Sequence, residues 1–376
     1  MLNVHHPPRL DLIENRLGSI DYKILTEIRQ VAAISAEWDD LLAKSRCNRA
    51  FSCSKWYLAT PELSPQLQPL VFIAERNGAL SGILPLWLDL DRKLMRFGDN
   101  YSDHPDIIAA HDDLDVITGL LARALQDTGS YDQVVLGQVK RDSNYVRGAR
   151  ALGLGDVVDS YFAPEKRLTY AVVDIACGYD EYMRRLSRKF RLHLHRICNK
   201  AEREGLIVCE LKAGQLSPEL LPDVFLPLHL NRFGEKTDFK SAESWMRKLF
   251  PAVFAEGRMR VFVVLQKGRV VAIDLETVTS SGMYSFNGGF LQEVSKYQPG
   301  KLLIHKVIQQ ACLEELNEFD LGWLGQEYKL HWKPTMREVG EIRFTICPEA
   351  DARMHSIKAG QGGCSAENLS LQAVKG

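Results

Sequence analysis

The feature that most restricts the fold of this chain is a Pro-Gly turn followed by an apolar helical segment and a short apolar strand. The turn is Pro299-Gly300, within the run Tyr297–Leu303, and the strand is Phe319–Gly322. A helix leaves its first backbone N–H groups without intrahelical partners, and phosphate groups bind there when these donors face solvent. This order of elements predicts an α/β domain that holds a phosphorylated molecule at one end of its sheet.

The two halves of the chain share one layout. In the first half the turn Asn77-Gly78 joins two apolar strands, and in the second half Lys267-Gly268 does the same. Such dipeptides favour hairpin turns. Each predicted hairpin follows a helical section and precedes a strand, a helix and a further strand. We therefore expect an α/β protein built from two tandem repeats with mixed, central sheets.

The limits of this pattern predict four segments. They are an N-terminal extension, a first and degenerate repeat, a second repeat that carries the chemistry, and a flexible tail rich in Gly and Ser: 1–19, 20–163, 164–347 and 348–376. A length of 376 residues is ordinary for a chain of two domains.

Composition excludes some classes of function. The net charge of −1 argues against a protein-wide attraction to nucleic acid, although a local basic stripe remains compatible with it. The eight cysteines are dispersed, which favours reduced thiols and no metal site. Residues 1–16 lack the apolar run of a signal peptide, and no run of about 18 apolar residues predicts a membrane span. We expect a cytoplasmic protein.

A long amphipathic helix is predicted over Tyr179–Glu204. Its apolar residues recur every three or four positions, as a single buried stripe requires: Met183, Leu186, Phe190, Leu194, Ile197 and Ala201. Its other side is strongly basic: Arg184, Arg185, Arg188, Lys189, Arg191, Arg196, Lys200 and Arg203. The basic side is either a solvated face or a surface that binds phosphate on a nucleotide or on tRNA.

These motifs resemble the GNAT acyltransferase superfamily, in particular its double-GNAT branch described as CelD/BioF2-like. The features that carry the resemblance are the basic run Arg188–Arg191, the Gly-turn hairpin, the run Tyr297–Leu303, and Phe319–Gly322 followed by Tyr328-Lys329. The resemblance covers roughly residues 20–347. It implies a sheet splayed between two strands, with acyl-CoA as co-substrate in the gap.

The resemblance also assigns a donor site. The pyrophosphate of acyl-CoA would lie on the turn, so the candidate residues are Tyr297, Gln298, Gly300, Lys301, Leu302 and Leu303. The usual phosphate loop of this superfamily has two glycines, whereas this chain has Gly300 alone, after Pro299, which has no N–H. The same fold serves transferases that take an amino acid from aminoacyl-tRNA and use no CoA.

Four residues are candidates for catalysis. Tyr328 is suited to protonate a leaving thiolate, although a packed tyrosine is the equal alternative. Asp274 and Glu276 alternate on one face of a predicted strand, and Glu276 is a candidate base unless that face is simply solvated. Asn287 lies on the next strand, and Asp320 on an apolar strand needs a partner if it is buried.

Candidate acceptor-binding residues come from three places. The polar loop 100–104 contributes Tyr101 and Asp103, which would otherwise form an ordinary capped turn. The basic helix contributes Arg191, and the signature after the last apolar strand contributes Lys329 and Trp332.

The sequence therefore predicts an enzyme, an acyl-CoA-dependent N-acyltransferase that moves an acyl group from acyl-CoA to an amine of a small-molecule or sugar-type acceptor by direct attack of that amine. The first alternative is an aminoacyl-tRNA-dependent transferase of the same fold. The second is a non-catalytic binding module in a polysaccharide or natural-product pathway. The identity of donor and acceptor, any tRNA or carrier-protein partner and the oligomeric state stay open.

Overall fold

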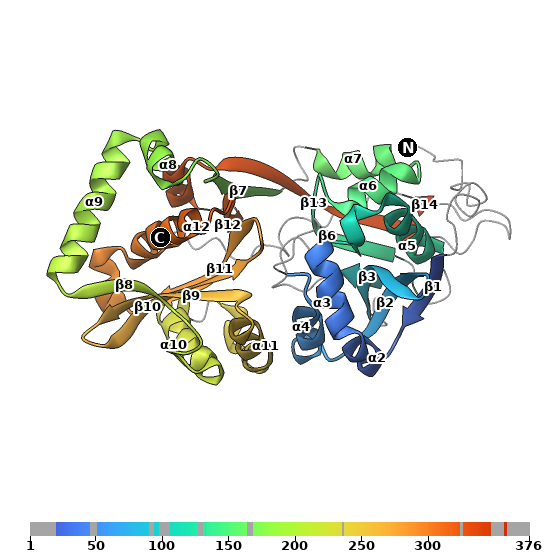
Figure 1. The fold of residues 1–376 in the computed structure, drawn as a ribbon, viewed down its shortest axis with the longest axis horizontal. Coiled ribbons are helices and arrows are strands. Elements are labelled where there is room, and N and C mark those ends of the chain that lie inside the picture. The colour runs from blue at the N-terminus through green and yellow to red at the C-terminus, as the bar shows by residue number, and fades with distance from the viewer. Residues whose placement is uncertain are drawn as a thin grey trace. The chain divides into compact units, whose positions relative to one another are not determined.

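The computed structural model divides into two compact units (Figure 1). It describes residues 20–45, 51–89, 94–97, 106–126, 131, 133–163, 168–234, 237–323, 326–346 and 357–358. The first unit contains the described residues up to Leu168 together with those from Glu338 onward, and the second contains Thr169–Arg337. The domain limits 20–163 and 164–347 stay predictions. The loop with Tyr101 and Asp103 lies outside the described residues.

The sheet of the first unit has the strands in the order β1 (Ile20–Leu25), β2 (Leu67–Arg76), β3 (Ala79–Asp89), β4 (Leu94–Phe97), β6 (Gln133–Lys140) and β13 (Thr335–Ile346). The pair β4–β6 is parallel, and its register joins all four residues of β4 to β6. The other neighbouring pairs are antiparallel. Two short strands, β5 (Ile108–Ala109) and β14 (Ile357–Lys358), pair with β3 and β13.

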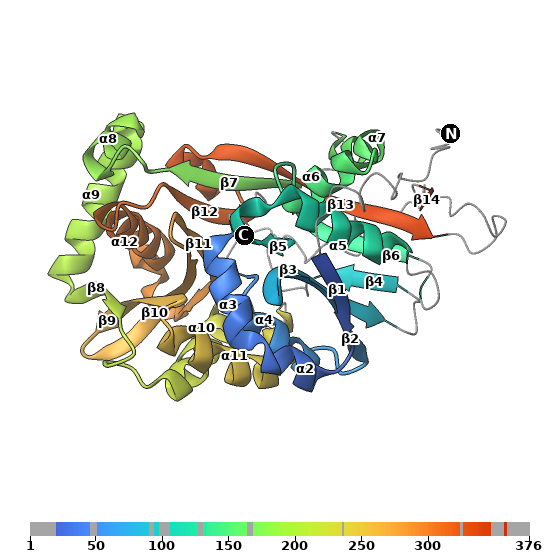
Figure 2. The same cartoon turned by 45° about the vertical axis from the view of Figure 1, so that its right-hand side comes forward.

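Helices cover both faces of this sheet (Figure 2). The helices α5 (Leu114–Gln126), α6 (Asn144–Ala151) and α7 (Gly155–Asp159) share one apolar core with β2 and β3. The helices α3 (Ser35–Lys44) and α4 (Ser54–Ala59) contribute the aromatic cluster on the other face, where Tyr57 stacks on Trp87 at 4.2 Å. The shorter segments are α2 (Ile28–Ala33), η1 (Thr60–Glu62), η2 (Ala110–Asp112) and η3 (Ser160–Phe162).

The sheet of the second unit has the order β7 (Leu168–Asp174), β12 (Glu318–Trp323), β11 (Gly282–Phe290), β10 (Arg269–Val278), β9 (Met259–Gln266) and β8 (Leu206–Leu211). Here β11 and β12 are parallel and the other pairs are antiparallel. Both hairpin turns form as expected, since Asn77-Gly78 and Lys267-Gly268 all have φ between 52° and 77°. Two residues in the left-handed region are what a tight hairpin turn requires.

In the second unit, the helices α8 (Tyr179–Arg185), α9 (Arg188–Arg203) and α12 (Pro299–Leu313) pack on one face of the sheet, and α10 (Leu221–Phe233) and α11 (Glu243–Ala255) pack on the other (Figure 1). The 3₁₀ segments are η4 (Pro218–Leu220), η6 (Asp238–Lys240), η7 (Gln292–Tyr297) and η8 (Glu327–Trp332). In each unit a hairpin precedes a strand, a helix and a strand parallel to the first. The tandem α/β architecture is confirmed.

The single helix predicted over 179–204 was wrong in one respect, because the structure has two helices there. Leu186 is extended, with ψ of 152°, and the Ser187 hydroxyl caps α9 by accepting the N–H of Phe190 at 3.2 Å. A serine at this position competes for the backbone and starts a new helix. The apolar stripe nevertheless faces the core in both helices, because the break preserves its direction.

Candidate active site

The parallel strands β11 and β12 are joined along only part of their length, which opens a fork in the sheet. Their ladder pairs residues 282–284 with 318–320 and ends at Tyr284 and Asp320. Strand β11 continues to Phe290 and β12 to Trp323. Both strands are irregular at this point, since the register shifts opposite Leu275 on the β10 side and after Asp320 on the β7 side. The backbone groups beyond the ladder are the ones that a ligand entering the fork would meet.

A pair of carboxyl groups lies on β10 beside this fork. Asp274 is opposite Gly288 of β11, and Glu276 is opposite Ser285. Their alternation places both on the face that packs against α12. Glu276 is fully buried, and neither of its carboxyl oxygens makes a hydrogen bond of ordinary geometry. Asp274 is only partly buried, so it is the more exposed member of the pair.

Burial changes the acidity of both groups. Loss of solvent raises the pKa of Asp274 to about 7, against the opposing influence of the Arg232 charge, the Glu276 carboxyl and Lys329. Loss of solvent and the neighbouring Asp274 charge raise the pKa of Glu276 well above its ordinary range. The shift of the Asp274 pKa places its change of protonation near neutral pH, and the shift of the Glu276 pKa favours the protonated form of that carboxyl. The solvated-face interpretation of this strand was wrong, because α12 and η8 cover it.

Tyr328 and Arg232 complete the surroundings of the pair. Tyr328 lies in η8, and burial raises its pKa to about 12, with Arg232 opposing this rise and the two carboxyls adding to it. Arg232 comes from the last turn of α10. Its charge is the largest influence that lowers the pKa of Asp274. Three segments far apart in sequence thus bring a phenol and a guanidinium close to Asp274.

Lys329 lies at the fork itself. Its ammonium donates to the carbonyl of Trp323 at 2.7 Å, and its side chain is buried. Gly322 has a φ of 79°, and a Cβ there would lie 3.8 Å from this ammonium. Asp320 stabilises the same bend, because its Oδ1 accepts the N–H of Gly322 at 2.8 Å. Lys329 and Asp320 therefore shape the end of β12 where the ladder stops.

Asn287 occupies the irregular part of β11. Its side-chain Oδ1 accepts the backbone N–H of Gly288 at 2.9 Å, so it stabilises the local bend of the strand. The next residue, Gly289, packs against the backbone of α10, where a Cβ would lie 2.3 Å from the N of His229. His229 is buried, and its Nδ1 contacts the carbonyl of Gly288 at 3.1 Å. This helix and this strand are thus held in direct backbone contact.

The predicted phosphate turn forms the start of α12 but offers one free amide rather than a row. Gln298 is left-handed, with φ of 55°, and Pro299 has no N–H. The N–H groups of Lys301 and Leu302 both donate to the carbonyl of Gln298, at 2.9 and 3.3 Å. Within the described part of the chain, the N–H of Gly300 has no hydrogen-bond partner, and the space at its Cα is open.

Side chains around the turn are already engaged. The Gln298 Oε1 accepts from Lys301 Nζ at 2.7 Å and contacts His193 Nε2 of α9 at 3.0 Å. Tyr297 is buried and directs its hydroxyl to Glu204 at 3.3 Å. A phosphate at this turn would thus meet the Gly300 amide and the ammonium of Lys301.

Three predicted ligand contacts are core side chains. Leu302 and Leu303 are each 2% exposed and Trp332 is 0% exposed, and all three belong to the core under α8, α9 and α12. The Trp332 ring packs edge-on against Phe190, and its carbonyl accepts the hydroxyl of Tyr182 at 2.9 Å. Their side chains cannot touch a ligand without leaving the core, so we do not retain them as direct contacts.

Arg191 binds its own chain. Its Nη1 donates to the carbonyls of Arg184 and Leu186 at 2.8 and 2.7 Å and also approaches that of Met183 at 3.3 Å. These carbonyls end α8, where the last C=O groups of a helix lack intrahelical partners. A guanidinium at a helix C-terminus also interacts favourably with the helix dipole. The geometry therefore gives Arg191 a capping role at the break between α8 and α9.

We expect Arg191→Ala to destabilise the protein by about 1–3 kcal/mol, because three carbonyls lose a charged donor. For a unit of this size that loss lowers Tm by about 2–4 °C per kcal/mol. The matched control is Arg188→Ala on the same helix, an exposed residue that should change Tm by about 1 °C at most. Equal melting temperatures for Arg191→Ala and wild type would leave the acceptor role predicted from sequence as the better account.

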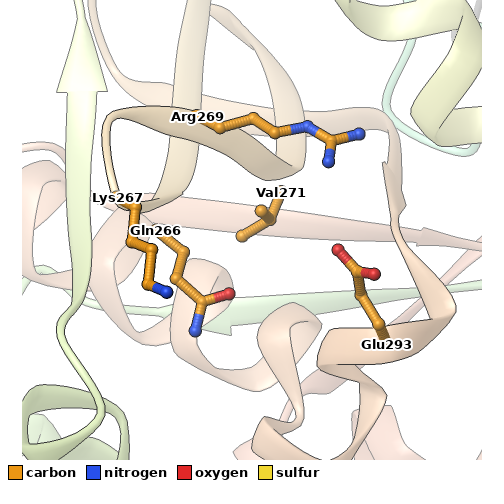
Figure 3. A pocket seen from close by; sticks show the side chains of 5 residues that line it. All are labelled: Gln266, Lys267, Arg269, Val271 and Glu293. Carbon is orange, nitrogen blue, oxygen red and sulfur yellow. The ribbon is translucent and has the colours of Figure 1, made fainter.

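A separate hollow of about 340 Å³ lies at the tip of the β9–β10 hairpin (Figure 3). It is lined by Gln266, Lys267, Arg269, Val271 and Glu293, with Glu293 contributed by η7. Its charged side chains are exposed to solvent, and none of them belongs to the set around Asp274. We assign no ligand to it.

Two further features are absent from the described ranges. No group of three or more His, Cys, Asp or Glu side chains there is arranged to hold a metal ion. No helix among those residues combines the length and the apolar character needed to cross a membrane.

Known proteins resemble this chain in two ways, by a family model over part of the sequence and by the fold of most of the chain. Residues 188–330 match the family model described as "Acetyltransferase (GNAT) domain". Among solved structures, FemX is 13% identical over 86% of this chain and 96% of its own, with a TM-score of 0.60. L-PGS from Bacillus licheniformis is 14% identical over 81% and 90%, with a TM-score of 0.51. No curated protein sequence gives a significant match. At these identities the two structures support the fold alone.

Sequence reasoning identified the strand with the two carboxyls but selected Glu276, the enclosed member. It missed Arg232 altogether. The sequence of β10 could have indicated Asp274, because Asp and Glu two residues apart on an otherwise apolar strand lie on the same face. Nothing in the local sequence of α10 indicated that Arg232 would approach them.

Proposed function

We propose that this chain, whose residues 188–330 match a GNAT domain, is an N-acyltransferase that transfers an acyl group directly to an amine. The observation that carries this proposal is the partly exposed Asp274 carboxyl beside the fork, with a pKa raised to about 7 and with the enclosed Glu276 carboxyl next to it. A general base works best when its pKa lies near the operating pH, and burial produces that value here.

The proposed reaction uses four groups of this site. Asp274 accepts the proton that the amine nitrogen loses as it forms its bond to the acyl carbon, and the bond from that carbon to the leaving atom then breaks. Lys329, at the fork, supplies positive charge near the oxyanion that develops on the carbonyl oxygen. Gly300 and Lys301 at the start of α12 bind a phosphate of the donor.

Tyr328 bears on the identity of the donor. A phenol with a pKa of about 12 is a weaker acid than a thiol, whose ordinary pKa is about 8.5. Tyr328 would therefore hydrogen-bond to a departing thiolate rather than protonate it, and the thiolate of CoA leaves without needing that proton. A ribose alkoxide is far more basic than a thiolate and would take the proton readily.

The first donor candidate remains acyl-CoA, as the GNAT resemblance implies. Aminoacyl-tRNA is the second candidate, favoured by the high pKa of Tyr328, by the single free amide of the turn and by the basic side of α9. An aminoacyl-tRNA donor requires Tyr328 to protonate the leaving ribose oxygen, whereas the thiolate of CoA leaves without that proton. Replacing the hydroxyl of Tyr328 should therefore impair transfer from aminoacyl-tRNA more than transfer from acyl-CoA. A small-molecule amine is the proposed acceptor in both cases.

A thermal-shift titration tests the donor. A ligand present at 100 times its dissociation constant adds about 2.7 kcal/mol of apparent stability. We expect acetyl-CoA or a longer acyl-CoA to raise Tm, and Lys301→Ala to reduce that rise. Bulk tRNA, measured at two salt concentrations, is the comparison, because phosphate contacts weaken steeply with salt. A shift with tRNA and none with any acyl-CoA would transfer the proposal to the second donor.

A further inference from the structure

Arg232 is a half-buried cation that lies beside two aromatic rings. Its guanidinium carbon lies 4.5 Å from the centre of the Phe233 ring and 5.2 Å from that of Phe290. Within the described ranges it makes no hydrogen bond and no ion pair. A guanidinium has five N–H donors in a rigid fork that matches a carboxylate or a phosphate. The two rings fix the position of the guanidinium, and its N–H donors are available to a ligand.

The Asp274 carboxyl does not satisfy these donors. Arg232 acts electrostatically on Asp274 and on Tyr328, so the three groups share one region. Nevertheless, Arg232 and Asp274 form no ion pair. A base and a cation thus face the same region without touching, an arrangement that suits a ligand carrying an amine and an anionic group.

The charges around Asp274 also favour a ligand with an anionic group. Two cations, Arg232 and Lys329, act electrostatically on Asp274. Lys329 is engaged at the end of β12, where its ammonium donates to the carbonyl of Trp323, so Arg232 is the cation that an anionic ligand would meet. Solvent screens a half-buried charge only in part, which strengthens its attraction for an anion.

We propose that the acceptor amine carries an oxyanion group, a carboxylate or a phosphate, which Arg232 binds while Asp274 faces the amine. The inference rests on the proposed acyl transfer and names the class of acceptor, a zwitterionic amine such as an amino acid or an amino-alkyl phosphate. The Phe233 and Phe290 rings hold the guanidinium, and its planar fork fixes the distance between the anionic end of the acceptor and the reacting nitrogen.

The experiment compares amines that differ only in the anionic group. The probes are an amino acid, its carboxamide, ethanolamine and phosphoethanolamine, each assayed with the donor that supports turnover. Wild type should acylate the anionic members with a KM about 10- to 100-fold lower than the neutral ones. Carboxylate and phosphate are the two sources of the charge, and the relative KM of the amino acid and phosphoethanolamine distinguishes them.

Variants of Arg232 locate the effect. Arg232→Met keeps the length of the side chain and should raise KM for the anionic amines about 10- to 100-fold, with kcat and the neutral amines nearly unchanged. Arg232→Lys should restore part of the preference. The matched control is Arg269→Met, an exposed arginine on β10 that should leave every constant unchanged. Melting curves exclude variants that fail to fold.

Two results would overturn the inference: wild type using neutral and anionic amines equally well, or Arg232→Met impairing both classes to the same extent. If no amine is acylated with any donor, the proposed function has failed, and calorimetric titration of the same four amines still decides this inference. Binding of the anionic amines that Arg232→Met abolishes would support it, and absence of binding would refute it.

Discussion

Replacing Asp274 by Asn is expected to lower kcat/KM for acyl transfer about 100- to 10,000-fold, the range in which general bases contribute. The carboxamide keeps the size of the side chain but cannot take a proton from the amine. In wild type, activity should fall as the pH is lowered through about 7, because Asp274 becomes protonated there. The measurement is a pH profile of kcat/KM for wild type and variant. Tyr328 stays protonated across this range and adds no second limb.

The same variant should be more stable than wild type at neutral pH. Asp274 has a folded-state pKa of about 7, above its ordinary value of about 4, so the folded state binds this proton more tightly than the unfolded state. The resulting stabilisation is complete below pH 4 and is lost as the pH rises through 7. An uncharged Asn avoids that loss. The Tm advantage of Asp274→Asn should therefore be small at pH 4 and grow up to pH 8.

Two further variants interpret this result. Asp21→Asn removes an exposed carboxylate from β1, a strand of the first unit, and should change neither activity nor stability. Glu276→Gln replaces an enclosed carboxyl, whose raised pKa favours the protonated form, by an amide of the same size, so it should retain activity within about tenfold. If Glu276→Gln were inactive while Asp274→Asn remained active, the base would be the enclosed carboxyl and our assignment would be reversed.

Replacing Gly289 by Ala should destabilise the second unit by about 3 kcal/mol or more. A Cβ at this position would lie 2.3 Å from the N of His229 and 2.4 Å from the carbonyl carbon of Leu228. These are backbone atoms, so no rotation of a side chain relieves the overlap, and α10 must move off β11. Because α10 carries Arg232, we expect activity to fall together with stability. Chemical denaturation of wild type and variant measures the change.

The matched control is Gly137→Ala, also in a β-strand, where an added Cβ would meet nothing within 4 Å. It should be neutral or stabilising by up to about 1 kcal/mol, because alanine restricts the unfolded chain. If Gly289→Ala proved as stable as this control, the backbone contact between α10 and β11 would be less tight than the structure indicates.

The fold was largely predictable because its strongest signals are local. The Gly-containing turns require positive φ at two residues, so they place both hairpins without reference to the rest of the chain. The start of α12 at Pro299 follows from the fixed φ of proline at the first helical position. The break at Ser187 was missed, since the apolar spacing is the same for one helix as for two that keep their direction.

The site was less predictable because it depends on distances across the sheet. The alternation on β10 indicates that Asp274 and Glu276 share a face, but only the packing of α12 and η8 determines that the face is covered. Which carboxyl a ligand can reach depends on that packing as well. The approach of Arg232 depends on the contact between α10 and β11 at Gly289, and no spacing rule within α10 expresses it.

The two repeats differ in how far their parallel strands stay paired. In the first, the parallel strands β4 and β6 stay joined over all four residues of β4, so its described ladder has no opening equivalent to the one after Tyr284. In the second, the ladder stops early. If the proposed function holds, the described residues therefore provide a single opening for a donor, and a donor titration should saturate at one molecule per chain.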